Sequence, residues 1–180
     1  MCVVADSGAA VEYAGPGVRR WLVSRPGLFE LLAGAERVVQ VSAPAGSGKT
    51  LLLRSWIAAE GLNERTAWVT VGRGERDGQA FWLSVLDSLR RTRIGSERVR
   101  ELTPGPDLDG ATIVRRLLDD VGSLDERLWL VLDDLQELQA EEAVQQLELL
   151  LGSAPRTCAS CCRPVVICGW GCTGCGWRVS

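Results

Sequence analysis

The sequence predicts an α/β protein in which a parallel β-sheet is covered by helices on both faces, giving three layers. Two observations lead to this fold class. Short apolar runs alternate with longer amphipathic segments along the chain, and the short runs are almost continuously apolar, as strands buried on both faces are. In addition, a glycine-rich turn joins one of these runs directly to a helical segment. The length of 180 residues fits one domain.

The first half of the chain supplies the first expected elements. Residues 1–22 carry small, polar, Gly and Pro residues without a clear period, so we expect a loose leader there. Apolar β-rich runs predict strands, and longer runs with a helical period predict helices. The expected elements are a short helix over 28–32, a strand over 37–42, a helix over 49–60 and a strand over 66–71.

The second half continues the alternation. A helix begins near residue 79, and the connection over 92–107 has room for a short helix. A helix over about 108–121, a buried strand within 127–135 and a helix over 140–151 complete the pattern. Each helix has one apolar face directed at the core; these faces contain Phe81, Trp82, Val85, Leu86 and Leu89, then Ile113, Val114, Leu117, Leu118 and Val121, then Ala143, Val144, Leu147, Leu150 and Leu151.

Composition limits the classes of function. The net charge is −3 and the pI is about 5.1, which gives no reason to expect a nucleic-acid-binding surface. We interpret the arginine-rich stretch over 90–100 as a solvated face. No apolar run reaches the roughly 18 residues of a membrane span. The N-terminus contains Asp6 and Glu12 and lacks a basic start, so it is a poor secretion signal. We expect a cytoplasmic protein with reduced cysteines and no membrane partner.

The segment APAGSGKT, residues 43–50, fits the phosphate-loop pattern G-x-x-x-x-G-K-[ST] except at Ala43. Glycine at positions 46 and 48 permits positive φ, so the backbone N–H groups can surround phosphate oxygens at a helix N-terminus. Lys49 is the only lysine of the chain and would place its charge between the β- and γ-phosphates. The hydroxyl of Thr50 would reach Mg²⁺. The expected nucleotide-binding residues here are Ala43, Pro44, Ala45, Gly46, Ser47, Gly48, Lys49 and Thr50.

An acidic pair follows the third buried strand, in LWLVLDDLQEL. A strand of a parallel sheet delivers its C-terminal residues to the sheet edge where ligands bind. Asp133 would hold Mg²⁺ through water, and Asp134 would orient or deprotonate an attacking water as the catalytic residue. Together with the phosphate loop, this pair predicts a P-loop NTPase that binds ATP and Mg²⁺.

Five segments resemble, in order, the N-terminal ATPase domain of the large ATP-binding LuxR-type transcriptional regulators, which belong to the STAND class of signalling NTPases. The resemblance covers about residues 23–155 and is carried by VSRPGLFELL, VQVSAPAGSGKTLLLRSW, TAWVTV, RDGQAFWLSVLDSL and LWLVLDDLQEL. It implies an ATP-dependent switch from a closed monomer to a self-associating form, with DNA binding by a separate helix-turn-helix. It also implies that Arg25 lies near the adenine.

The chain departs from the resemblance because it lacks the helical lid, the inducer-binding repeats and the helix-turn-helix. We therefore expect a fragment with weak or no ATP hydrolysis and no direct DNA contact of its own. The expected division is a leader over 1–22, a partial P-loop ATPase domain over 23–157, and a tail over 158–180. We expect the sheet to be incomplete at the C-terminal end.

The tail permits three interpretations, of which the first is a tail without a special role. Cys158-x-x-Cys161 and Cys172-x-x-Cys175 have the spacing of a zinc ribbon. Alternatively, with Cys encoded by TGC, residues 157–180 read one nucleotide upstream would give LRLVLPPRGDLRLGLHRLRLAGE, which we interpret as the tail of the family in a shifted frame. The run PVVIC, residues 164–168, is then expected to substitute for the strand between the first and third strands, with Pro164 tolerated only at its start. This substitution predicts a weakly stable domain or an aggregating one.

Two further functions stay open from the sequence. A small P-loop kinase or another AAA-type ATPase would share the phosphate loop and the acidic pair. The segments GRGERDG and RTRIGSERVR imitate the arginine-rich lid of such a kinase only loosely. A zinc-ribbon interaction module would instead depend on the cysteines of the tail.

Overall fold

The structure is a computed structural model that describes residues 2–3, 10–13, 20–23, 26–34, 38–42, 46–102, 109–122, 124, 126–153 and 165–170. Its centre is a five-stranded sheet in which every neighbouring pair is parallel. The strand order is β1-β4-β7-β6-β5. The strands are β1 (Cys2–Val3), β4 (Val38–Ser42), β5 (Thr66–Thr70), β6 (Trp129–Asp133) and β7 (Val165–Trp170).

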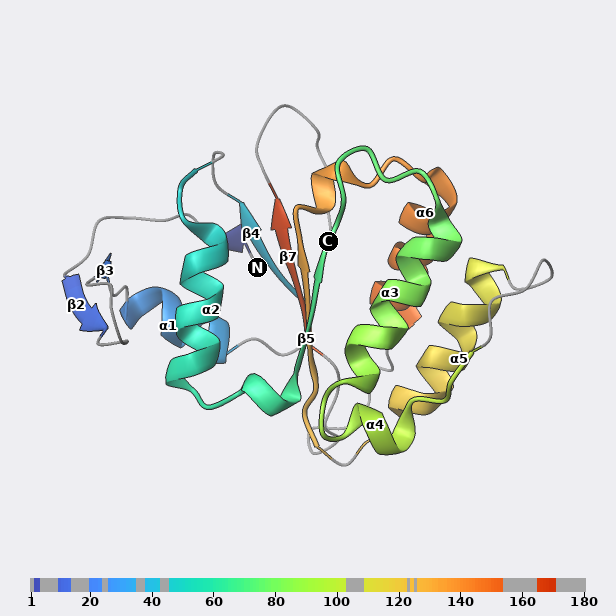
Figure 1. Ribbon diagram of the computed structural model, residues 1–180, viewed down its shortest axis with the longest axis horizontal. Coiled ribbons are helices and arrows are strands. Elements are labelled where there is room, and N and C mark those ends of the chain that lie inside the picture. Colours follow the sequence, from blue (N-terminus) through green and yellow to red (C-terminus); the bar gives the residue numbers. More distant parts are fainter. Residues whose placement is uncertain are drawn as a thin grey trace.

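Helices cover both faces of this sheet, as the sequence predicted (Figure 1). One face carries α1 (Pro26–Ala33) and α2 (Lys49–Ala59). The other face carries α3 (Gly78–Arg90), α5 (Gly110–Gly122) and α6 (Glu141–Ser153). The α/β class and the parallel sheet are therefore confirmed.

Three shorter helical segments complete the described chain. A 3₁₀ turn, η1 (Asn63–Arg65), precedes β5, and a second one, η2 (Leu135–Glu137), follows β6. A four-residue helix, α4 (Gly95–Arg98), lies in the connection after α3, where the sequence left room for a short helix. In Figure 1, α4 lies beyond the end of the sheet where the strands begin, opposite the edge that carries η2.

Each face of the sheet packs on its own hydrophobic core. The alternation of side chains along β6 separates the two cores, because Leu130 and Leu132 face α3, α5 and α6, whereas Trp129 and Val131 face α1 and α2. All five residues of β6 are buried. Trp129 also makes an edge-to-face contact with Trp56 of α2, with ring centroids 4.8 Å apart. The face of β6 that points to α2 also carries Asp133, the last residue of the strand.

The predicted helix faces form the larger core. Phe81 and Trp82 are 3% and 0% exposed, which confirms the prediction that they pack in the core. Three other predicted core residues lie at its margin, where they are partly buried and still pack against it: Leu118, Val144 and Leu151.

The strand β7 lies between β4 and β6, in parallel register with both. It begins directly after Pro164, as expected for a run whose proline is tolerated only at the start. The placement of this run between the first and third strands of the predicted set is confirmed. Its backbone pairs with β4 on one side and β6 on the other, strands whose facing edges would otherwise be unpaired.

The structure describes three short strands within residues 2–23, a segment for which the sequence predicted no regular element. The strand β1 pairs with the outer edge of β4, and β2 (Ala10–Tyr13) pairs antiparallel with β3 (Arg20–Val23). Pairing with β1 satisfies backbone groups of β4 that a free edge would expose. Local composition does not reveal such pairing, because the partner strand is distant in sequence. Among the described residues, no helix is long and apolar enough to cross a membrane.

Candidate functional site

The turn before α2 has the backbone geometry that the glycine pattern predicts. Gly46 has φ 76° and Gly48 has φ 85°, values in the left-handed region that non-glycine residues rarely adopt. Gly48 is the N-cap of α2, and no side chain caps this helix end. The first N–H groups of α2 are therefore not satisfied by a side-chain cap, which leaves them suited to an anion. Four predicted nucleotide-binding residues lie outside the described residues: Arg25, Ala43, Pro44 and Ala45.

Three more predicted nucleotide-binding residues lie in this turn and at the start of α2. Ser47 is exposed in the turn, and Lys49 and Thr50 are the first two residues of α2, both half-buried. The helix begins with a hydrogen bond from the Leu52 amide to the Gly48 carbonyl, 2.8 Å long. This geometry fixes Lys49 and Thr50 at the start of the helix, where the positive end of the helix dipole lies.

The side chain of Thr50 meets Asp133 through a hydrogen bond. The Thr50 hydroxyl donates to Asp133 Oδ2 at 2.8 Å. Thr50 lies on the same side of α2 as the buried residues Leu53 and Ile57, by the i, i+3, i+7 spacing of a helix. Asp133 shares its face of β6 with Trp129 and Val131, which pack against α2. The alternation of the strand and the period of the helix therefore bring together two predicted metal-binding residues.

Asp133 is buried and hydrogen-bonded through both its side chain and its backbone. Only 3% of the residue is exposed. While Oδ2 accepts from Thr50, Oδ1 accepts from the backbone N–H of Asp134 at 3.2 Å. The backbone carbonyl of Asp133 accepts from the amide of Val71, which extends the pairing of β5 with β6 by one residue. Buried carboxylates need such partners, and these contacts fix the orientation of the group at the end of the strand.

Asp134, the predicted catalytic residue, has an unusual backbone. With φ 56° and ψ 35°, it is the one non-glycine residue with positive φ among those that the structure describes. Such a conformation costs of order 1–3 kcal/mol and is concentrated at functional sites. Its Oδ1 accepts a hydrogen bond from the side-chain amide of Gln136 at 3.2 Å, so the carboxylate lies toward η2. Its action on a water molecule stays a prediction.

The described side chains would supply only a few of the ligands that a metal ion needs. Within the described ranges, no group of three or more His, Cys, Asp or Glu side chains could hold a metal. Mg²⁺ commonly binds through one or two protein oxygens while phosphates and water complete its octahedron. Thr50 and Asp133 fit that requirement. The cysteines of the alternative zinc site lie outside the described residues: Cys158, Cys161, Cys172 and Cys175.

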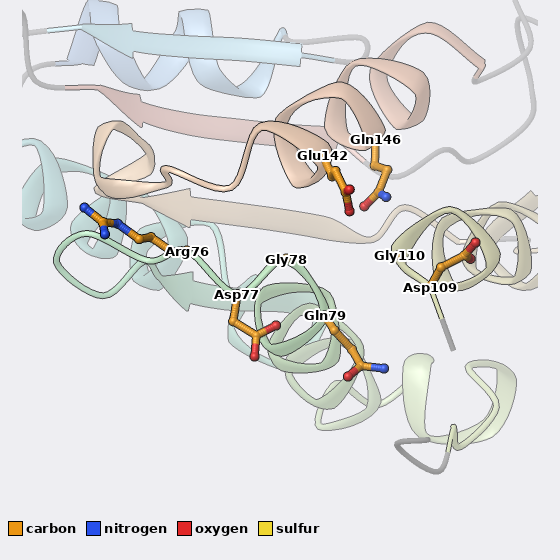
Figure 2. A pocket seen from close by; sticks show the side chains of 8 residues that line it. All are labelled: Arg76, Asp77, Gly78, Gln79, Asp109, Gly110, Glu142 and Gln146. Carbon is orange, nitrogen blue, oxygen red and sulfur yellow. The ribbon is translucent and has the colours of Figure 1, made fainter. Parts of the chain in front are cut away.

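A cavity of about 480 Å³ is lined by residues at and near the starts of three helices (Figure 2), which cover the face of the sheet opposite to α2. It lies at the beginnings of α3, α5 and α6, and none of the predicted site residues lines it. Its lining residues are Arg76, Asp77, Gly78, Gln79, Asp109, Gly110, Glu142 and Gln146.

Two of these residues cap helices. Asp77 accepts from the amide of Ala80 at 2.9 Å, and Asp109 accepts from the amide of Thr112 at 2.7 Å. Hydrogen bonds from the side chain and the backbone of Thr112 lower the pKa of Asp109 below its ordinary value. The capping preference for Asp at such positions is a sequence signal that could have identified both residues.

The contacts of the loop after β6 were not predicted from the sequence. The amide of Gly74 donates to Glu137 Oε2 at 3.3 Å, and the amide of Gln139 donates to the carbonyl of Glu75 at 2.7 Å. These contacts join two loops that are about sixty positions apart in the sequence. Loop residues of this type carry no periodic pattern, so no local signal indicates the pairing.

Comparison with known proteins gives partial similarity. No family model matches the chain. Proteins named serine/threonine-protein kinase PknK, from Mycobacterium tuberculosis and Mycobacterium bovis, are 27% identical to the chain over 137 residues. The matched region is 72% of this chain and 12% of each relative. The chain is thus similar to a small part of much longer proteins.

Proposed function

We propose that this chain binds ATP together with Mg²⁺ and acts as the switch domain of a LuxR-type transcriptional regulator, with the P-loop NTPase fold. The observation that carries the nucleotide-binding part is the hydrogen bond between Thr50 and Asp133. A hydroxyl at the start of a helix and a buried carboxylate at the end of a strand are the protein groups that Mg²⁺ shares with a triphosphate in this fold.

The proposed roles follow from position. The amides of residues 46–50, at the uncapped start of α2, would donate to the phosphate oxygens. Lys49 would neutralise the β- and γ-phosphates. Thr50 and Asp133 would hold Mg²⁺, which supplies charge neutralisation when it is bound. Asp134 would orient a water molecule. The strand order β4-β7-β6-β5 supports assigning these residues to a P-loop NTPase sheet with ligands at its carboxyl edge.

The regulatory part of the proposal rests on the order of the five sequence segments rather than on the site. In that proposal, ATP controls self-association, and DNA contact belongs to another part of the regulator. A cytoplasmic location is also part of the proposal and is supported by the lack of a membrane-spanning helix among the described residues. The relatives with the kinase name share only 12% of their length with this chain, and we propose that the shared part is a nucleotide-dependent module.

Thermal stability measured with and without ATP·Mg²⁺ tests the binding. At about 100 times its Kd, a ligand stabilises the native state by about 2.7 kcal/mol, or about 5–10 °C in Tm for a domain of this size. Lys49→Ala is expected to abolish the shift. Arg98→Ala is the matched control, because it removes one exposed positive charge on α4, beyond the opposite end of the sheet. An unchanged Tm of the wild-type chain at saturating ATP·Mg²⁺ contradicts the proposal.

A small-molecule or protein phosphotransferase is a second candidate, favoured by the name of the relatives. It shares the phosphate-binding residues, so binding alone does not separate the two functions. Incubation with ATP labelled at the γ-phosphate, followed by a search for labelled acceptor, separates them. We expect no labelled acceptor and slow or undetectable release of phosphate, and Asp134→Asn is expected to remove any phosphate release that occurs.

A further inference from the structure

Two loops at the carboxyl edge of the sheet are joined into one unit, which we call the strap: residues 72–77 after β5 and residues 134–139 after β6. Glu75 and Leu138 form a parallel β-bridge. The Gln139 amide donates to the Glu75 carbonyl at 2.7 Å, and Arg76 Nε donates to Gln139 Oε1 at 3.0 Å. Backbone and side-chain bonds therefore both hold the strap together.

One end of the strap reaches the proposed nucleotide site. The amide of Glu137 donates to the carbonyl of Asp134 at 2.9 Å, and the amide of Asp134 donates to Asp133 Oδ1. Asp133 in turn accepts from Thr50 on α2. A continuous set of hydrogen bonds thus leads from the start of α2 to η2. From η2, the Glu137 carboxylate accepts from the amide of Gly74 in the other loop.

The other end of the strap reaches α3. The amide of Asp77 donates to Glu75 Oε1 at 2.9 Å, and Asp77 caps the first turn of α3 through the Ala80 amide. Arg76, Asp77 and Gly78 also form part of the wall of the 480 Å³ cavity (Figure 2). A shift of the strap therefore moves the N-terminus of α3 and one wall of this cavity.

The strap contains a strained residue followed by a short 3₁₀ turn. Asp134 holds a left-handed backbone conformation, and the following η2 is a single 3₁₀ turn. Strained non-glycine residues and short 3₁₀ turns are typical of hinges and switches. Coupling between two sites requires such an element, whose equilibrium both sites bias.

We infer that the strap transmits the occupancy of the nucleotide site to the first turn of α3 and to the wall of the cavity. This inference rests on the proposed function. When Asp133 and Asp134 change their hydrogen bonds around a bound metal and triphosphate, η2 changes with them. The bonds of Glu137 and Gln139 to the loop over 72–77 carry that change to Asp77 and α3.

Hydrogen–deuterium exchange of the full chain, with and without ATP·Mg²⁺, measures this transmission. Peptides over 134–144 report the near end, and peptides over 72–82 report the far end. In the wild type, ATP·Mg²⁺ is expected to slow exchange in both, by roughly fivefold or more at the far end. The double variant with Glu137→Ala and Gln139→Ala removes both side-chain bonds between the loops and keeps the bond from the Gln139 amide to the Glu75 carbonyl. Its near end is expected to keep the response, and its far-end response is expected to fall.

Conservative variants separate transmission from damage to the fold. Glu137→Gln keeps an oxygen that accepts from the Gly74 amide, so it is expected to retain the far-end response. Gln139→Ala alone removes an exposed side chain. It tests the inference if the double variant does not fold, and its far-end response is expected to fall in part.

Each outcome decides between the two proposals. Absence of ATP·Mg²⁺ binding to the wild type, measured by calorimetry, overturns the proposed function and the strap together. Binding with a response at 134–144 and none at 72–82 overturns the strap alone. Equal far-end responses in the wild type and in the double variant also overturn it. If the double variant does not fold, equal far-end responses in the wild type and in Gln139→Ala overturn it. Loss of the far-end response with retained binding supports it.

Discussion

Thr50 and Asp133, 83 positions apart in the sequence, are joined by a hydrogen bond of 2.8 Å. Asp133 ends β6, whereas Thr50 lies on α2, the helix that follows β4, and β7 separates β4 from β6 in the sheet. The contact therefore depends on the order of the whole sheet and on the inward faces of both elements. A buried carboxylate with a hydroxyl donor on one oxygen and a backbone donor on the other is well satisfied without a ligand.

Replacing Thr50 tests what this contact contributes. Thr50→Val keeps the shape and removes the donor, which leaves Asp133 Oδ2 buried with one partner fewer. We expect a loss of about 1–3 kcal/mol in the free energy of unfolding and a loss of the Mg²⁺ dependence of ATP binding. Urea denaturation and titrations with and without Mg²⁺ measure both effects. Thr50→Ser retains the hydroxyl and should stay close to the wild type. If Thr50→Val matches Thr50→Ser in both measurements, the contact has neither role.

The meeting of the two motifs could be predicted from the sequence because both are anchored to periodic elements. Five apolar residues before Asp133 predict a buried strand, and a helix follows residues 46–48 directly. Parallel strands place their carboxyl ends at one edge, so the two motifs had to lie near each other. Contact between the two side chains further requires that each points toward the other element. These directions follow from the helical period of 3.6 residues and the strand period of 2.

Contacts that leave no local pattern in the sequence could not be predicted in this way. The pairing of β1 with β4 and the bond between Gly74 and Glu137 connect residues without a shared period. The left-handed conformation of Asp134 is also invisible locally, since many Asp residues after strands adopt ordinary conformations. These features depend on where the completed sheet brings the loops, which is a tertiary effect.

Gly48→Ala should weaken both the fold and ATP binding. A Cβ on Gly48 meets no atom within 4 Å, so the effect comes only from its φ of 85°, which costs roughly 1–2 kcal/mol for a non-glycine residue. Gly61→Ala is a matched control, because Gly61 has φ 65°, equally open space and a place beyond the other end of α2. We expect similar losses of stability in urea melts. Only Gly48→Ala should lower the affinity for ATP, by about tenfold or more. Equal affinities of the two variants would argue against phosphate binding by this turn.

Gly95→Ala is predicted to be among the more damaging small substitutions in the described part of the chain. A Cβ at this position would overlap the backbone carbonyl oxygen of Leu89 and lie 2.7 Å from the hydroxyl of Thr92. Both groups are held by the turn that leads into α4, where Thr92 Oγ1 donates to the Leu89 carbonyl and accepts from the Gly95 amide. Overpacking of this kind costs about 1–3 kcal/mol. Gly122→Ala, whose Cβ meets nothing within 4 Å, should change Tm little. A Gly95→Ala variant as stable as Gly122→Ala would show that the turn can shift freely.

Asp109 is expected to make the stability of the start of α5 depend on pH. Its pKa is lowered from 3.8 by the hydrogen bonds from Thr112, so the ionised form is the one that the native state favours. The stabilisation is therefore present above about pH 4 and is lost as the pH falls through the lower pKa of the folded state. Asp109→Asn retains the cap without the charge. We expect the wild type to have the higher Tm at pH 6, through the interaction of the carboxylate with the positive end of α5, and the difference to shrink below about pH 4. Asp109→Ala should be less stable than Asp109→Asn throughout. A Tm difference between the wild type and Asp109→Asn that stays constant from pH 6 to pH 3 would show that this carboxylate does not contribute through its charge.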